Sequence, residues 1–188
     1  PKVRGIAITD ELYDLVLFLS HSFVRPTVSE LYALRHSDIA VATDPKRLLI
    51  TVRAGKTGYR IANSMPAAVA VYDRIRRRYP DAKPSDYIFY PDYQNRETAA
   101  RNIQRQFRMV LDVAGVKDDP EAGLKYTIYS LRHTAICMRL ILSHGEVNIF
   151  NPSTASAEVI SRGDGKVWAI DRFGLNAFVE GNPQAGNA

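Results

Sequence analysis

The amino-acid sequence predicts an α+β protein that is mainly helical and carries one small antiparallel sheet. Two observations predict this class. Apolar residues recur every three or four positions in five separate stretches, which is the spacing of amphipathic helices. Between the second and third of these stretches, over residues 38–65, the spacing changes to the alternation of strands, divided by the turn sequences Asp44-Pro45 and Gly55-Lys56-Thr57-Gly58. We therefore expect a three-stranded antiparallel meander within a helical domain.

The chain divides into a body, residues 1–150, and an atypical tail, residues 151–188. The body carries 22 Lys and Arg residues against 16 Asp and Glu residues, a net charge of +6, whereas the tail has 3 against 4, a net charge of −1. The basic body suits a nucleic-acid partner, although a similar charge is common among proteins that bind nothing acidic. The tail is rich in Gly, Asn, Ser and Ala, and we expect it to hold at most one short helix and to be partly disordered.

Several classes of protein and site have no support in the sequence. No apolar run approaches the ~20 residues of a membrane span, and the lone cysteine, Cys137, rules out a disulfide framework. A reducing cytoplasm is therefore the expected setting. The glycine-rich, zinc-binding and hydrolase motifs of common enzymes are absent, so we expect neither a metal nor a small-molecule cofactor. Because the first residue is proline, the chain is expected to be a piece of a longer protein.

The first two helices are predicted from their start signals. Thr9 precedes two acidic residues and an apolar stripe that runs to about Ser20, which predicts an N-capped helix. The run Thr27-Val28-Ser29-Glu30 matches a capping box, in which Glu30 would accept from the Thr27 amide, and predicts a second helix from Leu31. Arg25 lies just before this cap, where a loop arginine in water is the alternative to a functional one.

The strands are expected at residues 38–43, 48–52 and 59–62. Lys56 is at the tip of the second hairpin, where its side chain could reach a neighbouring cleft. A solvated hairpin lysine is the commoner alternative.

Two further helices follow the sheet. Pro66 opens the first, which ends in the basic run Arg74–Arg78, interpreted as a solvated face that offsets the helix dipole. After a short buried element at residues 87–90, the second helix runs from about Arg96 to Ala114 and stops at Gly115. Its inward face comprises Ile103, Phe107, Val110, Leu111 and Ala114. Its other face comprises Arg101, Arg105 and Arg108, and either lies along a DNA backbone or is simply solvated.

The last predicted helix, residues 131–142, carries Arg132 and His133 in its first turn. Free N–H groups and the positive end of the helix dipole favour an anion there, and a guanidinium adds a planar fork that matches two phosphate oxygens. The start of this helix is therefore a candidate phosphate site. An ordinary first-turn arginine in solvent is the alternative.

Three of these features occur in a meaningful order. Arg25 precedes Ser-Glu-Leu-x-Ala-Leu, Lys56 lies in Gly-Lys-Thr-Gly, and Arg132 lies in Tyr-x-Leu-Arg-His-Thr, with separations of 31 and 76 residues. Over roughly Thr9–Asn148 this order resembles the catalytic domain of the tyrosine recombinase (phage integrase) family. The resemblance implies an integrase-type catalytic fold and double-stranded DNA as the partner. It leaves self-association on DNA open.

The resemblance also implies a role for each matching residue. Arg25 and Arg132 would hold the non-bridging oxygens of a DNA phosphodiester, and Lys56 would protonate the departing 5′-oxygen. Glu30 and His133 belong to the same motifs and are expected to support the site. The implied activity is DNA strand cleavage and rejoining through a phosphotyrosine, without a metal.

The chain also departs from the family's pattern. Glu30 follows Arg25 by five residues where three are usual, and Tyr129 replaces a histidine. A phenol can hydrogen-bond a phosphate oxygen but is a poor base near neutral pH. No tyrosine follows Arg132, so we expect this chain to lack a nucleophile. The alternatives are a non-catalytic DNA-binding or regulatory remnant, and a basic helical domain whose arginines are only solvated.

Overall fold

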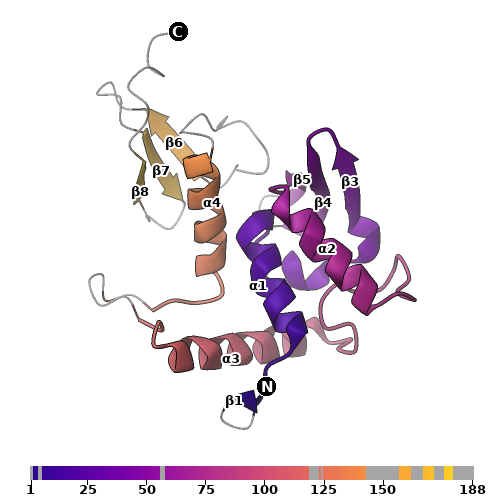
Figure 1. Cartoon of the computed structure of the whole chain (residues 1–188). Coiled ribbons are helices and arrows are strands. Elements are labelled where there is room, and N and C mark those ends of the chain that lie inside the picture. The colour runs from indigo at the N-terminus through magenta and orange to yellow at the C-terminus, as the bar shows by residue number, and fades with distance from the viewer. Residues whose placement is uncertain are drawn as a thin grey trace.

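The computed structural model of the chain, shown in Figure 1, describes residues 2–3, 6–55, 58–118, 123, 125–142, 157–161, 167–171 and 176–179. Within these residues the α+β class is confirmed. The α-helices are α1 (Asp10–Ser22), α2 (Ala67–Arg78), α3 (Arg96–Ala114) and α4 (Ser130–Leu142), and the short 3₁₀ helices are η1 (Leu31–Ala33) and η2 (His36–Asp38). The strands are β1 (Lys2–Val3), β2 (Ile6–Ala7), β3 (Ile39–Thr43), β4 (Lys46–Gly55), β5 (Gly58–Asn63), β6 (Ala157–Ser161), β7 (Val167–Asp171) and β8 (Asn176–Val179).

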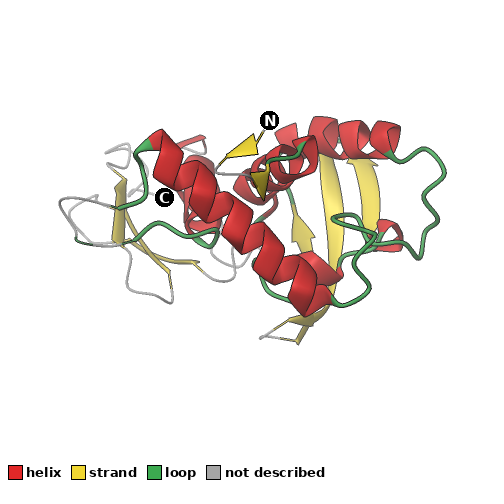
Figure 2. Cartoon of the chain, turned by 90° about the horizontal axis from the view of Figure 1, so that it is seen from below, coloured by secondary structure: helices red, strands yellow, loops and turns green. Residues whose placement is uncertain are grey.

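The predicted meander is confirmed as an antiparallel sheet of strand order β3-β4-β5. On the central strand, Leu48, Ile50 and Val52 are buried and alternate with half-buried neighbours, as expected for a sheet with one face on the core. Helix α2 packs against β4. Figure 2 shows the strands and helices from below.

Helix α1 lies at the centre of the fold, in contact with α2, α3 and α4 (Figure 1). Thr9 caps it as predicted, since the Thr9 hydroxyl accepts from the Leu12 amide at 3.3 Å. The helix ends at Phe23, whose φ of 60° is unusual for a residue with a side chain. The Phe23 ring is buried, and this burial offsets the backbone cost. The end of α1 thereby directs the following loop, with Arg25, toward α4.

Helix α3 follows the prediction at both ends. The Asn95 side chain caps its start, and Gly115 ends it with a φ of 69°. Ile103 and Phe107 are buried in the core as expected. Ala114, predicted to face inward, is exposed, because the last turn of α3 extends past the core.

The second predicted helix is wrong. Only one 3₁₀ turn, η1, forms there, and Glu30 does not accept from the Thr27 amide, which donates instead to the Arg25 carbonyl at 2.8 Å. The Glu30 carboxylate is bound by Arg25 and Arg60. A charged group buried with two cations gains more from them than from one exposed helix cap, and the loop follows the carboxylate.

The expected character of the tail is also wrong where the structure describes it. Instead of at most one short helix, β6, β7 and β8 form an antiparallel three-stranded sheet. Val167–Asp171 is the central strand, and its apolar run Val-Trp-Ala-Ile suits a strand as well as a helix, an ambiguity that periodicity alone leaves open in short segments. The expected disorder concerns residues outside the described ones.

The basic end of α2 is only in part the solvated face that was predicted, because Arg77 is exposed whereas Arg74 and Arg78 are held by a partner on α1. Arg74 and Arg78 both form ion pairs with Asp14, a fully buried carboxylate on α1. These pairs join α1 to α2 and provide the cations that a buried carboxylate requires. The spacing of four residues places both arginines on one side of α2.

Replacing Arg74 and Arg78 by Gln tests whether Asp14 depends on them. Each single replacement leaves the carboxylate one arginine, and we expect the free energy of unfolding to fall by about 1 kcal/mol. The double replacement leaves a buried charge without a cation, so we expect a loss of about 3 to 5 kcal/mol, more than the single losses together. Urea denaturation measures this coupling, with exposed Arg77→Gln as the control. Additive single losses would contradict the shared carboxylate.

Candidate functional site

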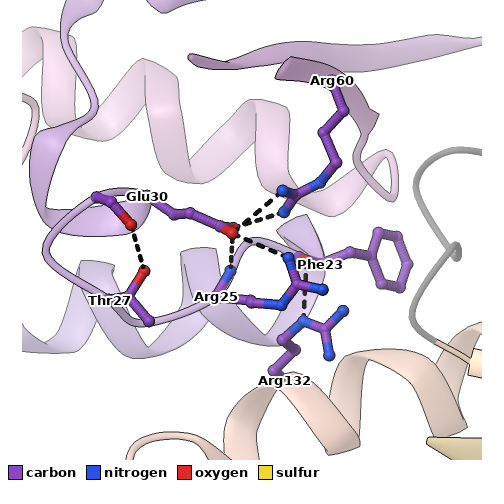
Figure 3. A network of polar contacts seen from close by, with 7 residues as sticks. Phe23, Arg25, Thr27, Glu30, Arg60 and Arg132 are labelled. Atoms are coloured by element: carbon purple, nitrogen blue, oxygen red, sulfur yellow. Dashed lines mark hydrogen bonds and ion pairs between the residues drawn. The ribbon is translucent and has the colours of Figure 1, made fainter. Parts of the chain in front are cut away.

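A buried carboxylate, Glu30, organises the candidate site (Figure 3). Its Oε1 accepts from Arg25 Nη1 at 2.9 Å and from Arg60 Nη1 at 3.1 Å. Its Oε2 accepts from the Arg25 backbone amide at 3.1 Å and from Arg60 Nη2 at 2.5 Å. The Glu30 side chain is 1% exposed, against 8% for Arg25 and 12% for Arg60. Glu30 therefore holds the loop after α1 against strand β5.

The two arginines lower the pKa of Glu30. Burial raises the pKa, but the hydrogen bonds and charges of Arg60 and Arg25 lower it more, so the net shift is downward from 4.5. Glu30 is therefore ionised at neutral pH, and the carboxylate and the arginines are a charged cluster.

Gly55, at the end of β4, lies against this cluster. A Cβ on Gly55 would approach Arg60 Nη1 to 2.6 Å and Glu30 Oε1 to 2.7 Å, so a larger residue would displace one of them. Lys56 comes next in the sequence and lies outside the described residues. Arg25, Lys56 and Arg132 are predicted to converge on one cleft. Of these three residues, the structure describes the two arginines.

Arg132 joins the cluster from α4. It lies in the first turn of that helix, as predicted, but at 2% exposure it is not a solvated arginine. Its Nε–H donates to the Phe23 carbonyl at 3.1 Å, which fixes the guanidinium beside the end of α1. Among the described residues, its buried Nη1 finds no hydrogen-bond partner. Figure 3 shows the Arg132 and Arg25 guanidinium groups side by side.

The proximity of the other two arginines also affects the pKa of Arg132. Burial lowers its pKa most, Tyr129 opposes that shift, and the charges of Arg25 and Arg60 lower the pKa further. Among the described residues, Arg25 and Arg60 pair with Glu30 and Arg132 lies within electrostatic range of all three, so three guanidinium groups face one carboxylate in a largely buried place. Such an arrangement is costly unless an anion joins it.

Tyr129 and His133 lie at the start of α4 beside Arg132. Their rings are 5.5 Å apart between centroids, tilted by 45°, and both side chains are half-buried. The structure therefore places Tyr129 next to the buried arginine. Tyr129 also interacts electrostatically with Arg132.

The arginine stripe of α3 is separate from this cluster. Arg101 and Arg105 are exposed, and Arg101 donates to the neighbouring Thr98 hydroxyl at 3.4 Å. Arg108 comes nearer, because it lines a cavity of about 250 Å³ together with Tyr129. The stripe therefore borders the site at one end.

The sequence did not predict that Arg60 belongs to this site. An isolated arginine on a short strand carries no motif, and its role depends on Glu30, 30 residues earlier. The available signal was Glu30 itself, an acid within an apolar segment that requires a cation if buried.

Searches against protein families, curated proteins and solved structures found no match to this chain. In the part of the chain that the structure describes, no group of three or more His, Cys, Asp or Glu side chains is placed to hold a metal ion. No helix there is long and apolar enough to cross a membrane.

Replacing Glu30 by Gln should remove a pH-dependent stabilisation. Because the folded pKa of Glu30 lies below 4.5, its ionised form stabilises the fold above pH 4.5, and this stabilisation is lost as the pH falls through the folded pKa. We expect Glu30→Gln to be less stable than the wild type by about 3 kcal/mol at neutral pH, with the difference shrinking in acid. Urea denaturation across this pH range measures it, with exposed Glu97→Gln as the control. A difference that stays constant in acid would show that the charge of Glu30 contributes nothing.

Proposed function

We propose that this chain is the catalytic-type domain of a tyrosine recombinase, or integrase, that binds double-stranded DNA with one phosphodiester held between Arg25 and Arg132. The observation that carries the proposal is the buried Nη1 of Arg132, which lies next to Arg25 and has no hydrogen-bond partner among the described residues. The order of these residues along the chain agrees with the family resemblance. The cytoplasm remains the expected compartment, from the cysteine content alone.

A phosphodiester suits this place for two reasons. Its two non-bridging oxygens can accept from two guanidinium groups at once, which satisfies the unused N–H groups of Arg132. Its negative charge also offsets the positive excess that Glu30 leaves. The exposed Arg101 and Arg105 favour a polyanion over a small acid, because they extend the positive charge beyond the site.

The chemistry proposed for the family fits these groups. A hydroxyl oxygen attacks phosphorus, the bond from phosphorus to the 5′-oxygen breaks, and the five-coordinate intermediate state carries added negative charge. Arg25 and Arg132 would stabilise that charge. Lys56 would give its proton to the departing 5′-oxygen, a role supported by its position directly after Gly55, which touches the Glu30–Arg60 pair.

Tyr129 is proposed to donate a hydrogen bond to the phosphate, because it lies three residues before Arg132 at the same helix start. His133 would support Tyr129 through their ring contact.

A second candidate function is a DNA-binding or regulatory domain that does not cleave. It is favoured by one observation, that residues 133–188 contain no tyrosine. Both candidates predict binding at the same arginines, and only the covalent step distinguishes them.

Arg132→Lys tests the binding site, because lysine keeps the charge and lacks the planar fork. We expect affinity for a duplex to fall about 10- to 100-fold, corresponding to loss of one or two charge-assisted hydrogen bonds. Fluorescence anisotropy measures the affinity, and circular dichroism checks that the variant is folded. Arg77→Lys, on the exposed surface of α2, is the control. Equal affinity of a folded Arg132→Lys variant and the wild type would overturn the proposed site.

A nicked suicide DNA substrate tests the covalent step. We expect no adduct that survives denaturing electrophoresis, because the chain after Arg132 offers only serine and threonine hydroxyls, whose pKa is far above the ~10 of a phenol. Tyr129 lies too close to Arg132 in sequence for an in-line attack on a phosphate held there. An adduct mapped to Tyr129 or to a later serine would contradict this expectation.

A further inference from the structure

A basic cavity lies apart from the cluster of Glu30, Arg25, Arg60 and Arg132, which we call the Glu30 cluster. It has a volume of about 460 Å³ and opens between the β3–β4 turn, the end of β5 and helix α4. Its lining includes three cationic residues, Lys46, Arg47 and Arg139, together with Asn63 and Ser64, and no carboxylate. We call it the Arg139 pocket.

The three cations of the Arg139 pocket lack acidic partners. In the described part of the chain none of them forms an ion pair. Arg47 is held in place by neutral acceptors, donating from Nε to Asn63 Oδ1 at 3.0 Å and from Nη1 to the Pro45 carbonyl at 3.0 Å. The Arg139 guanidinium lies 5.8 Å from the centre of the Phe23 ring. Two of the three side chains are thus already oriented, which lowers the cost of binding an anion.

The pocket has a fixed relation to the Glu30 cluster. Arg139 follows Arg132 by seven residues, two turns along the same face of α4, which places their Cα atoms about 10 Å apart. Phe23 lies between them, with its carbonyl on Arg132 and its ring under Arg139. Each strand of duplex DNA carries a phosphate for about every 3.4 Å of its axis, so one strand presents phosphates at such a separation.

We propose that the Arg139 pocket binds a second backbone phosphate of the same DNA, near the phosphodiester held by Arg25 and Arg132. This inference rests on the proposed function. The alternative occupant within the chain is the tail, residues 151–188, but its net charge of only −1 makes it a poor ligand for three cations. A phosphate oxygen accepts from Arg47, Arg139 and Lys46 together and relieves the repulsion between them.

The test is the salt dependence of DNA binding by a Lys46→Gln/Arg139→Gln double variant of the full chain. Arg47 is left intact because it holds the β3–β4 turn. Losing one phosphate contact should reduce the slope of log K against log salt by about 0.9 and weaken binding at low salt about tenfold. The matched control, Arg77→Gln/Lys83→Gln, removes two exposed cations elsewhere and should keep the wild-type slope. Thermal melting confirms that both variants are folded.

The outcomes separate the two proposals. If the double variant keeps the wild-type slope while Arg132→Lys loses affinity, the Arg139 pocket is not a phosphate site and the proposed function stands. An equal change of the salt slope in the matched control also overturns the proposal for the Arg139 pocket, because the loss of net charge alone would then explain the change. If the wild type shows no salt-dependent binding to a duplex, both proposals fail.

Discussion

The ion pairs of Glu30 are the interaction on which the arrangement of this site depends. One buried carboxylate binds Arg25 from the loop after α1 and Arg60 from β5, and so joins two segments that are 30 residues apart. Gly55 permits this approach because any side chain there would displace one of the partners. A carboxylate in such a place is stable only with its cations, and the cations are stable only with it. The loop conformation and the positive site are therefore two consequences of the same contact.

Two buried acids of this protein illustrate the difference between a structural cluster and a candidate binding site. Asp14 has two arginines whose side chains remain 40% and 26% exposed, although one nitrogen of each, Arg74 Nη2 and Arg78 Nη1, is buried without a hydrogen-bond partner among the described residues. Glu30 also has two arginines, but Arg132 adds a third guanidinium that is only 2% exposed and whose Nη1 likewise has no hydrogen-bond partner among the described residues. Among the described residues, the deficit of negative charge is therefore larger in the second cluster, which has three guanidinium groups for one carboxylate against two for one at Asp14. This deficit is the physical reason to expect a ligand.

Much of the fold could be predicted because its signals are local. Thr9, Gly115 and the turn after Val52 act within a few residues of their own positions, and they set helix ends and strand breaks whatever the rest of the chain does. The presence of Arg25 and Arg132 at one site could also be predicted, because each lies in a short motif of a few residues. These predictions required no knowledge of how distant segments pack.

The errors arose where a distant partner outcompeted a local pattern. The capping box at Thr27 is a valid local signal, but the Glu30 carboxylate binds Arg60, and the Thr27 amide donates to the Arg25 carbonyl instead. In the same way, Arg74 and Arg78 have the pattern of a solvated helix end, and only the packing of α1 against α2 reveals Asp14 as their partner. Burial of Arg132 likewise depends on Phe23, 109 residues earlier. Buried charge is a tertiary property, and no single segment encodes it.

Arginine side-chain NMR of the protein titrated with duplex DNA tests the central claim most directly, because it reports on each guanidinium separately. We predict that the Nε resonances of Arg25 and Arg132 shift together as the DNA binds, while that of Arg74 stays in place. Shifts confined to exposed arginines such as Arg101 and Arg105, with Arg25 and Arg132 unchanged at saturation, would show that the Glu30 cluster is a structural feature and holds no phosphate.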